Sequence, residues 1–110
     1  HLAGDEAIQR IAQATRKAVR ESDIVCRWGG EEFAVLASHC NQAQAVELSE
    51  KIRAAIKSTL LVSNHPETHL TASAGVAEAH EGDDANTLLA RSDKALYQAK
   101  ELGRDRVEVA

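Results

Sequence analysis

The stretch DIVCRWGGEEFAVLA, residues 23–37, decides how this chain folds, because two β-type segments flank a pair of adjacent glycines. DIVCRW (23–28) and FAVLA (33–37) are rich in β-branched, aromatic and other apolar residues, which favours two short strands. Gly29 and Gly30 can both adopt positive φ, so they predict a two-residue hairpin loop. Glu31 and Glu32 then fall at successive strand positions and point to opposite faces.

Helices are predicted on both sides of this hairpin. Apolar residues recur at helical spacing in three segments, 5–19, 42–58 and 88–102. Asp5 and Asn41 are candidate N-caps, and Gly103 is a candidate residue for ending the last helix. Residues 60–79 indicate a strand, a polar turn and a strand, and residues 105–110 a final strand. The predicted order is α-ββ-α-ββ-α-β, an α+β chain forming one domain over residues 1–110.

The composition argues against several classes of protein. The net charge is −4, whereas modules that hold DNA by general phosphate attraction carry a basic face. No apolar run approaches the ~18 residues of a membrane-spanning helix. The two cysteines, Cys26 and Cys40, are expected as thiols in a reducing cytosol, with a disulfide between them as the alternative. The chain has 20 alanines and only 3% aromatic residues, which predicts a thin hydrophobic core.

The Gly-Gly-Glu-Glu segment has a chemical as well as a structural interpretation. Gly29 and Gly30 have no side chains, so a phosphate can approach their backbone amides. A carboxylate from Glu31 or Glu32 can hold Mg²⁺, an ion that shares its remaining coordination sites with phosphate oxygens and water. The alternative is an ordinary type I′ turn with solvated glutamates.

Two further pairs of residues fit the same chemistry. Lys100 and Arg104 flank the end of the last predicted helix. They either complement the helix dipole or bind triphosphate oxygens. Arg20 and Asp23 lie three residues apart where a helix gives way to a strand. They form either an ordinary ion pair or an exposed fork that reads the edge of a guanine.

Taken in order, these motifs resemble the GGDEF family, the diguanylate cyclases, which join two GTP molecules into cyclic di-GMP. The matching segments are HLAGD (1–5), RESD (20–23), RWGGEEF (27–33), LTASAGVA (70–77) and SDKALYQAKELGRDRV (92–107). They run through nearly the whole chain, and GGEEF is an active form of the family signature. The resemblance implies the nucleotide-cyclase and polymerase-palm type of α+β fold, an antiparallel-rich mixed sheet with helices packed against it.

The resemblance also implies a role for each matching residue. Glu31 and Glu32 are the expected catalytic residues and ligands of Mg²⁺ or Mn²⁺, and Glu31 would help to deprotonate the attacking 3′-hydroxyl. Asp5 would hydrogen-bond the guanine, the loop glycines would cradle the phosphates, and two cations would steady the triphosphate. The substrate-binding residues are thus Asp5, Gly29, Gly30, Lys100 and Arg104.

An inhibitory site for the product is implied as well. Arg20 and Asp23 match this site, with Lys51 and Arg53 on the following helix as cationic contacts. Family members often carry arginine where this chain has Lys51, and the two cations are not interchangeable. The segment GRD (103–105) also departs from the commoner GRN, which puts Asp105 next to the second triphosphate-binding cation.

Part of the family pattern has no counterpart in the chain. The family's first strand, with a metal-binding aspartate, and the following segment, with a guanine-binding asparagine, would precede His1. We therefore expect an N-terminally truncated domain, and no cyclase activity from residues 1–110 alone. The complete domain is expected to work as a homodimer, in which each protomer contributes half of the site.

The resemblance implies a cytoplasmic domain that binds GTP and cyclic di-GMP and no nucleic-acid polymer. An upstream sensory module, or a parent protein attached to the inner membrane, is compatible with it. The alternative function is a cyclic-di-GMP-binding regulatory module without catalytic activity, which the Arg20 and Asp23 pair favours. A dimerisation module is a weaker alternative, since it leaves the paired glycines and glutamates unexplained.

Overall fold

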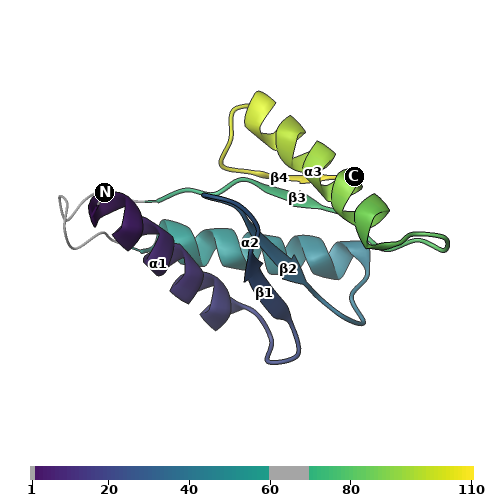
Figure 1. Cartoon of the computed structure of the whole chain (residues 1–110), viewed down its shortest axis with the longest axis horizontal. Coiled ribbons are helices and arrows are strands. Elements are labelled where there is room, and N and C mark those ends of the chain that lie inside the picture. The colour runs from purple at the N-terminus through teal and green to yellow at the C-terminus, as the bar shows by residue number, and fades with distance from the viewer. Residues whose placement is uncertain (1, 60–69) are drawn as a thin grey trace.

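The computed structural model describes residues 2–59 and 70–110 and contains three helices and four strands within them (Figure 1). In chain order these are α1 (Leu2–Ala18), β1 (Ile24–Arg27), β2 (Phe33–Leu36), α2 (Gln42–Lys57), β3 (Ala74–Val76), α3 (Ala85–Glu101) and β4 (Val107–Val109). This order confirms the α+β prediction, while the strand and turn predicted within residues 60–69 lie outside the described residues. No helix in the described part of the chain is both long and apolar enough to cross a bilayer.

Capping side chains set the starts of α2 and α3. The Asn41 side chain accepts a hydrogen bond from the Gln44 amide at 2.9 Å, and the Gln44 side chain accepts one from the Asn41 amide. Asp84 and Thr87 form the same reciprocal box before α3. The N-cap predicted at Asp5 is wrong, since α1 begins three residues earlier. Asp5 instead lies in the first helical turn, where the helix dipole also favours a carboxylate.

The strands of the described chain form two separate ladders. β1 and β2 pair antiparallel, from Ile24 opposite Leu36 to Arg27 opposite Phe33. β3 and β4 pair in parallel through the α3 crossover. Figure 1 shows the β3–β4 ladder between α3 and α2, and both helices contact both strands. α1 packs against α2. The predicted mixture of strand directions is present, with one ladder of each direction.

The core is small and rich in alanine, as predicted. Four of the six buried apolar residues among those described are alanines: Ala14, Ala18, Ala95 and Ala99. Small residues allow close approach where β3 crosses α3. A Cβ atom on Gly75 would lie 2.2 Å from the Ser92 carbonyl oxygen. Leu102, predicted on the buried face of the last helix, is 56% exposed because it lies at the helix end as its C-cap.

Candidate functional site

The loop between β1 and β2 is wider than predicted. Its backbone closes on the Glu32 carbonyl, which accepts hydrogen bonds from the amides of Trp28 at 2.8 Å and Gly29 at 3.2 Å. The Arg27 guanidinium donates to the carbonyl oxygens of Gly29 at 3.2 Å and Gly30 at 2.7 Å. Neither glycine has a positive φ. The predicted two-residue loop is therefore wrong, because the Arg27 side chain and the Glu32 carbonyl hold a longer one.

Gly30 nevertheless presents an open backbone, as its predicted role requires. A Cβ atom on Gly30 would meet no heavy atom within 4 Å, and one on Gly29 would meet only the Glu32 Cβ at 4.0 Å. The Gly30 amide donates no hydrogen bond to any residue that the structure describes. A phosphate oxygen can therefore reach this amide without displacing a side chain.

Glu31 and Glu32 both precede β2, which begins at Phe33. The prediction that they occupy successive strand positions is wrong, because the wider loop includes them. Glu31 is exposed, and its carboxylate has no hydrogen bond or ion pair within residues 2–59 and 70–110. The Glu32 carboxylate lies 3.5 Å from the Lys100 ammonium, with both side chains partly exposed.

The donor set of this loop fits a hard divalent cation. Within the described residues, no group of three or more His, Cys, Asp and Glu side chains forms a complete metal site. Mg²⁺ and Mn²⁺ prefer oxygen ligands, and Mg²⁺ commonly takes only one or two carboxylates together with phosphate oxygens and water. Glu31 and Glu32 supply two adjacent carboxylates of this kind.

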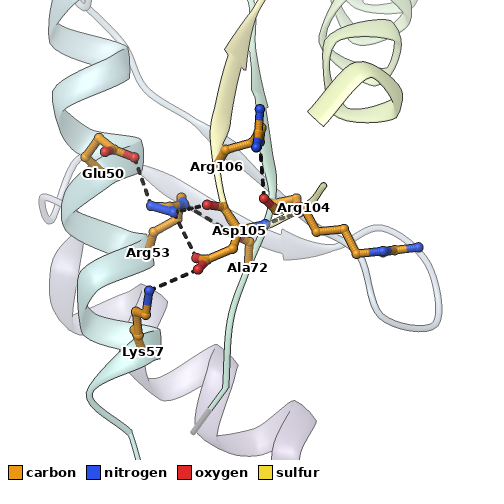
Figure 2. Close-up of polar contacts among 8 residues, drawn as sticks. Glu50, Arg53, Lys57, Ala72, Arg104, Asp105 and Arg106 are labelled. Carbon is orange, nitrogen blue, oxygen red and sulfur yellow. Dashed lines mark hydrogen bonds and ion pairs between the residues drawn. The ribbon is translucent and has the colours of Figure 1, made fainter. Parts of the chain in front are cut away.

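The two predicted triphosphate-binding cations lie at the end of α3. Lys100 is in its last turn, and the fold brings its ammonium to Glu32 across 68 positions of the sequence. Gly103 follows with φ of +118°, which confirms it as the residue that ends the helix. Arg104 is exposed, and Figure 2 shows its side chain extending away from Arg53.

Arg20 and Asp23 form an ion pair between α1 and β1, and Arg20 Nη2 lies 2.7 Å from Asp23 Oδ1. The Arg20 backbone amide also donates to this carboxylate, and the guanidinium donates to the Ser38 carbonyl. The Arg20 hydrogen bond lowers the pKa of Asp23 against the opposing effect of its burial. The Asp23 side chain is 0% exposed and the Arg20 side chain 48% exposed. Only the arginine side of the predicted fork therefore faces solvent.

Within the described residues, no hydrogen bond or ion pair joins the remaining predicted residues to the Arg20–Asp23 pair or to the Glu32–Lys100 pair. Asp5 is exposed in the first turn of α1. Lys51 is exposed on α2, and it makes no hydrogen bond or ion pair with the rest of the described chain. Arg53 does not reach Arg20, since its side chain is 15% exposed and its donors bind elsewhere.

Sequence reasoning missed the partners of Arg53, which are drawn in Figure 2. Arg53 and Lys57 lie one turn apart on α2 and hold the two oxygens of the Asp105 carboxylate, each at 2.9 Å. The hydrogen bond from Lys57, together with both positive charges, lowers the pKa of Asp105. We call these three residues the Asp105 clasp. The sequence did contain a signal for this contact. Two cations lie four residues apart on a predicted helix, and an aspartate occurs in the segment GRD.

One shallow depression of 360 Å³ opens beside the clasp. It is lined by Val46, Glu50, Arg53, Asp105, Arg106 and Val107. None of the loop glycines or glutamates lines it, so the depression is separate from the β1–β2 loop. The candidate site is therefore an open surface formed by that loop and the end of α3.

Comparison with known proteins shows the family to which the chain is related. The family model "Diguanylate cyclase, GGDEF domain" matches residues 1–106. The chain is 42% identical over its whole length to diguanylate cyclase DgcP of Pseudomonas aeruginosa, and spans 16% of that relative's length.

The chain is also similar in fold to solved structures. The GGDEF domain of DgcB from Caulobacter crescentus, in complex with c-di-GMP, is 30% identical with a TM-score of 0.91, over 99% of this chain and 66% of that one. The active GGEEF domain of a diguanylate cyclase from Vibrio cholerae is 32% identical with a TM-score of 0.90, over 99% and 69% of the two chains. With its loop, its Glu32–Lys100 pair and its matching segments in place, the chain belongs to the GGDEF family of diguanylate cyclase domains.

Proposed function

We propose that this chain belongs to the catalytic domain of an enzyme that condenses two GTP molecules into cyclic di-GMP. One observation carries the proposal, namely the ion pair between Glu32 and Lys100 beside an open Gly-Gly backbone. It puts a carboxylate suited to a divalent cation next to an ammonium suited to a phosphate. Phosphoryl transfer depends mainly on such positioning and on neutralising charge around the phosphates.

The proposed reaction forms two phosphodiester bonds. Each GTP offers its 3′-hydroxyl to the α-phosphate of the other, and two pyrophosphates leave. Two protomers must therefore face each other, which makes a homodimer the expected active state. The exposed carboxylate of Glu31 has no partner among the described residues, so it is available to accept the proton of the attacking hydroxyl.

The other residues bind and orient the substrate. Mg²⁺ or Mn²⁺, held by Glu31 and Glu32, would neutralise charge on the triphosphate. The Gly30 amide donates a hydrogen bond to one phosphate oxygen, and Lys100 and Arg104 bind other oxygens of the triphosphate. Asp5 accepts hydrogen bonds from the guanine edge.

A product-binding site is proposed at Arg20. The buried Asp23 carboxylate fixes the Arg20 guanidinium, whose exposed side can bind the guanine or the phosphate of cyclic di-GMP. Lys51 adds a flexible positive charge from α2. We place this domain on the cytoplasmic side of the cell, where GTP is available, within a longer protein that supplies a sensory or membrane-attached module.

The proposal is tested by incubating the protein that carries this chain, at its natural length, with GTP and Mg²⁺ and separating the products by chromatography. Cyclic di-GMP and pyrophosphate are expected in a ratio of one to two. Glu31→Gln should abolish product formation, because the amide cannot accept the proton. Glu81→Gln is the matched control, since Glu81 is an exposed loop glutamate outside the site. Absence of cyclic di-GMP from the wild-type protein would refute the proposal.

A further inference from the structure

The backbone that follows α3 is unusual over three consecutive residues. Gly103, Arg104 and Asp105 have φ of +118°, +65° and +48°. Residues other than glycine enter this left-handed region at a cost of about 1 kcal/mol or more each, and they stay there only where surrounding contacts determine it. The contacts that hold Arg104 and Asp105 therefore also determine where the Arg104 side chain begins.

The Asp105 clasp supplies the contacts to Asp105 from α2, while the Arg104 amide donates to the Ala99 carbonyl of α3 at 2.9 Å. Arg53 donates to both the carbonyl and the carboxylate of Asp105, and its Nε donates to the Ala72 carbonyl at 3.2 Å. The Ser73 hydroxyl accepts a hydrogen bond from the Asp105 amide at 3.1 Å. Arg53 thus ties the residue after Arg104 to the strand region that precedes β3. Since its side chain is only 15% exposed, solvent competes weakly for these bonds.

The clasp also keeps the Asp105 carboxylate from pairing with the neighbouring Arg104 guanidinium. An aspartate directly after Arg104 would be expected to attract its guanidinium away from a ligand. The two Asp105 carboxylate oxygens are instead taken by Arg53 and Lys57. Figure 2 shows the Arg104 side chain extending to the opposite side of the backbone from these cations. The Arg104 guanidinium makes no hydrogen bond within the described residues, so its donors remain available to an anion.

We infer that Arg53 and Asp105 are positioning residues, which hold the left-handed backbone at Arg104 and keep its guanidinium free for the triphosphate. The inference rests on the proposed function, because it assigns Arg104 to GTP. It gives α2 a part in substrate binding, although neither Arg53 nor Asp105 touches the substrate.

A double-mutant cycle on the natural-length protein tests this inference, with steady-state kinetics for GTP as the measurement. Arg104→Ala is expected to raise KM about tenfold, the loss of one charge-assisted hydrogen bond to phosphate. Arg53→Ala should raise KM by a similar factor and lower kcat less. In the Arg104→Ala background, Arg53→Ala should change KM little further, because it acts through Arg104.

Two further variants separate the proposed positioning role from general damage to the fold. Arg91→Ala is the matched control, since Arg91 also joins a carbonyl to a carboxylate, those of Glu78 and Asp83, at the other end of α3. It should leave KM unchanged. If Arg53→Ala fails to fold, Asp105→Asn replaces it. Asparagine tolerates the left-handed region but loses the charge that holds Lys57, so a smaller rise in KM is expected.

The outcomes separate the two proposals. If Arg104→Ala raises KM and Arg53→Ala does not, the positioning role is refuted while the assignment of Arg104 stands. An increase from Arg53→Ala that persists in full in the Arg104→Ala background would also refute it, because independent effects multiply. If Arg104→Ala itself leaves KM unchanged, the assignment of Arg104 to the triphosphate is overturned, and the inference with it.

Discussion

Replacing Gly75 with alanine is expected to force β3 and α3 apart. The added Cβ would lie 2.2 Å from the Ser92 carbonyl oxygen and 2.3 Å from the Leu96 amide nitrogen, whereas ordinary contact begins at 3.4 Å. Both atoms belong to the backbone of a helix, so no side chain can rotate to relieve the clash. One element must move by about 1 Å in a tightly packed region.

This displacement sets the expected loss of stability. Overpacking typically costs about 1–3 kcal/mol, and we expect about 3 kcal/mol here because backbone must move. For a domain of this size that is a fall in Tm of roughly 10–20 °C. Urea and thermal unfolding followed by circular dichroism measure it. The same shift should lower GTP turnover, because α3 carries Lys100 to Glu32.

A matched glycine variant controls for the change of residue type. Gly4→Ala places its Cβ where no heavy atom lies within 4 Å, in the first turn of α1. It should leave stability unchanged or raise it by up to about 1 kcal/mol, since alanine is the better helix former. If the free energy of unfolding of Gly75→Ala lies within about 0.5 kcal/mol of the wild-type value, the close packing described for β3 on α3 is wrong.

Three further outcomes are expected. Gly30→Ala should leave the unfolding transition unchanged, because its Cβ enters open space, yet raise KM for GTP about tenfold by blocking the amide; an unchanged KM would contradict this role. The His80 amide, with Thr87 and Arg91, lowers the pKa of Asp83 to about 2, so its stabilising effect is complete above about pH 4 and lost as pH falls through 2. The stability difference between the wild type and Asp83→Asn should shrink over that range, and a difference that is as large at pH 2 as at pH 5 would count against this account. Arg20→Ala should raise the calorimetric Kd for cyclic di-GMP at least about tenfold, and an unchanged Kd would remove the product site.

Local signals in the sequence predicted most of the fold. Asn41 and Gly103 mark helix ends through their own side-chain and backbone chemistry, and the structure confirms both. The burial of Ala18, Ala95 and Ala99 follows from helical spacing, whereas that of Ala14 was not predicted. The wider β1–β2 loop did not follow, because it depends on Arg27 reaching two carbonyl oxygens, which no spacing of apolar residues indicates.

The candidate site, too, could be predicted only in part from the sequence. The motifs identified Glu32 and Lys100, yet only the fold shows that they meet. Arg20 and Asp23 were recognised as a pair because they lie three residues apart, whereas the burial of the carboxylate depends on packing. The contact between Arg53 and Asp105 joins residues 52 positions apart, so it could not be read from any local pattern.

The parallel β3–α3–β4 segment has a consequence for how the candidate site is assembled during folding. Its contacts close short stretches of chain, so Lys100 is presented by a region contiguous in sequence. Glu32 belongs to a hairpin formed earlier in the chain, and joining the two closes a much longer loop at a greater cost in entropy. If the proposed function is correct, turnover depends on the contact between these two regions, and a variant that weakens only this contact should lose turnover while each region stays folded.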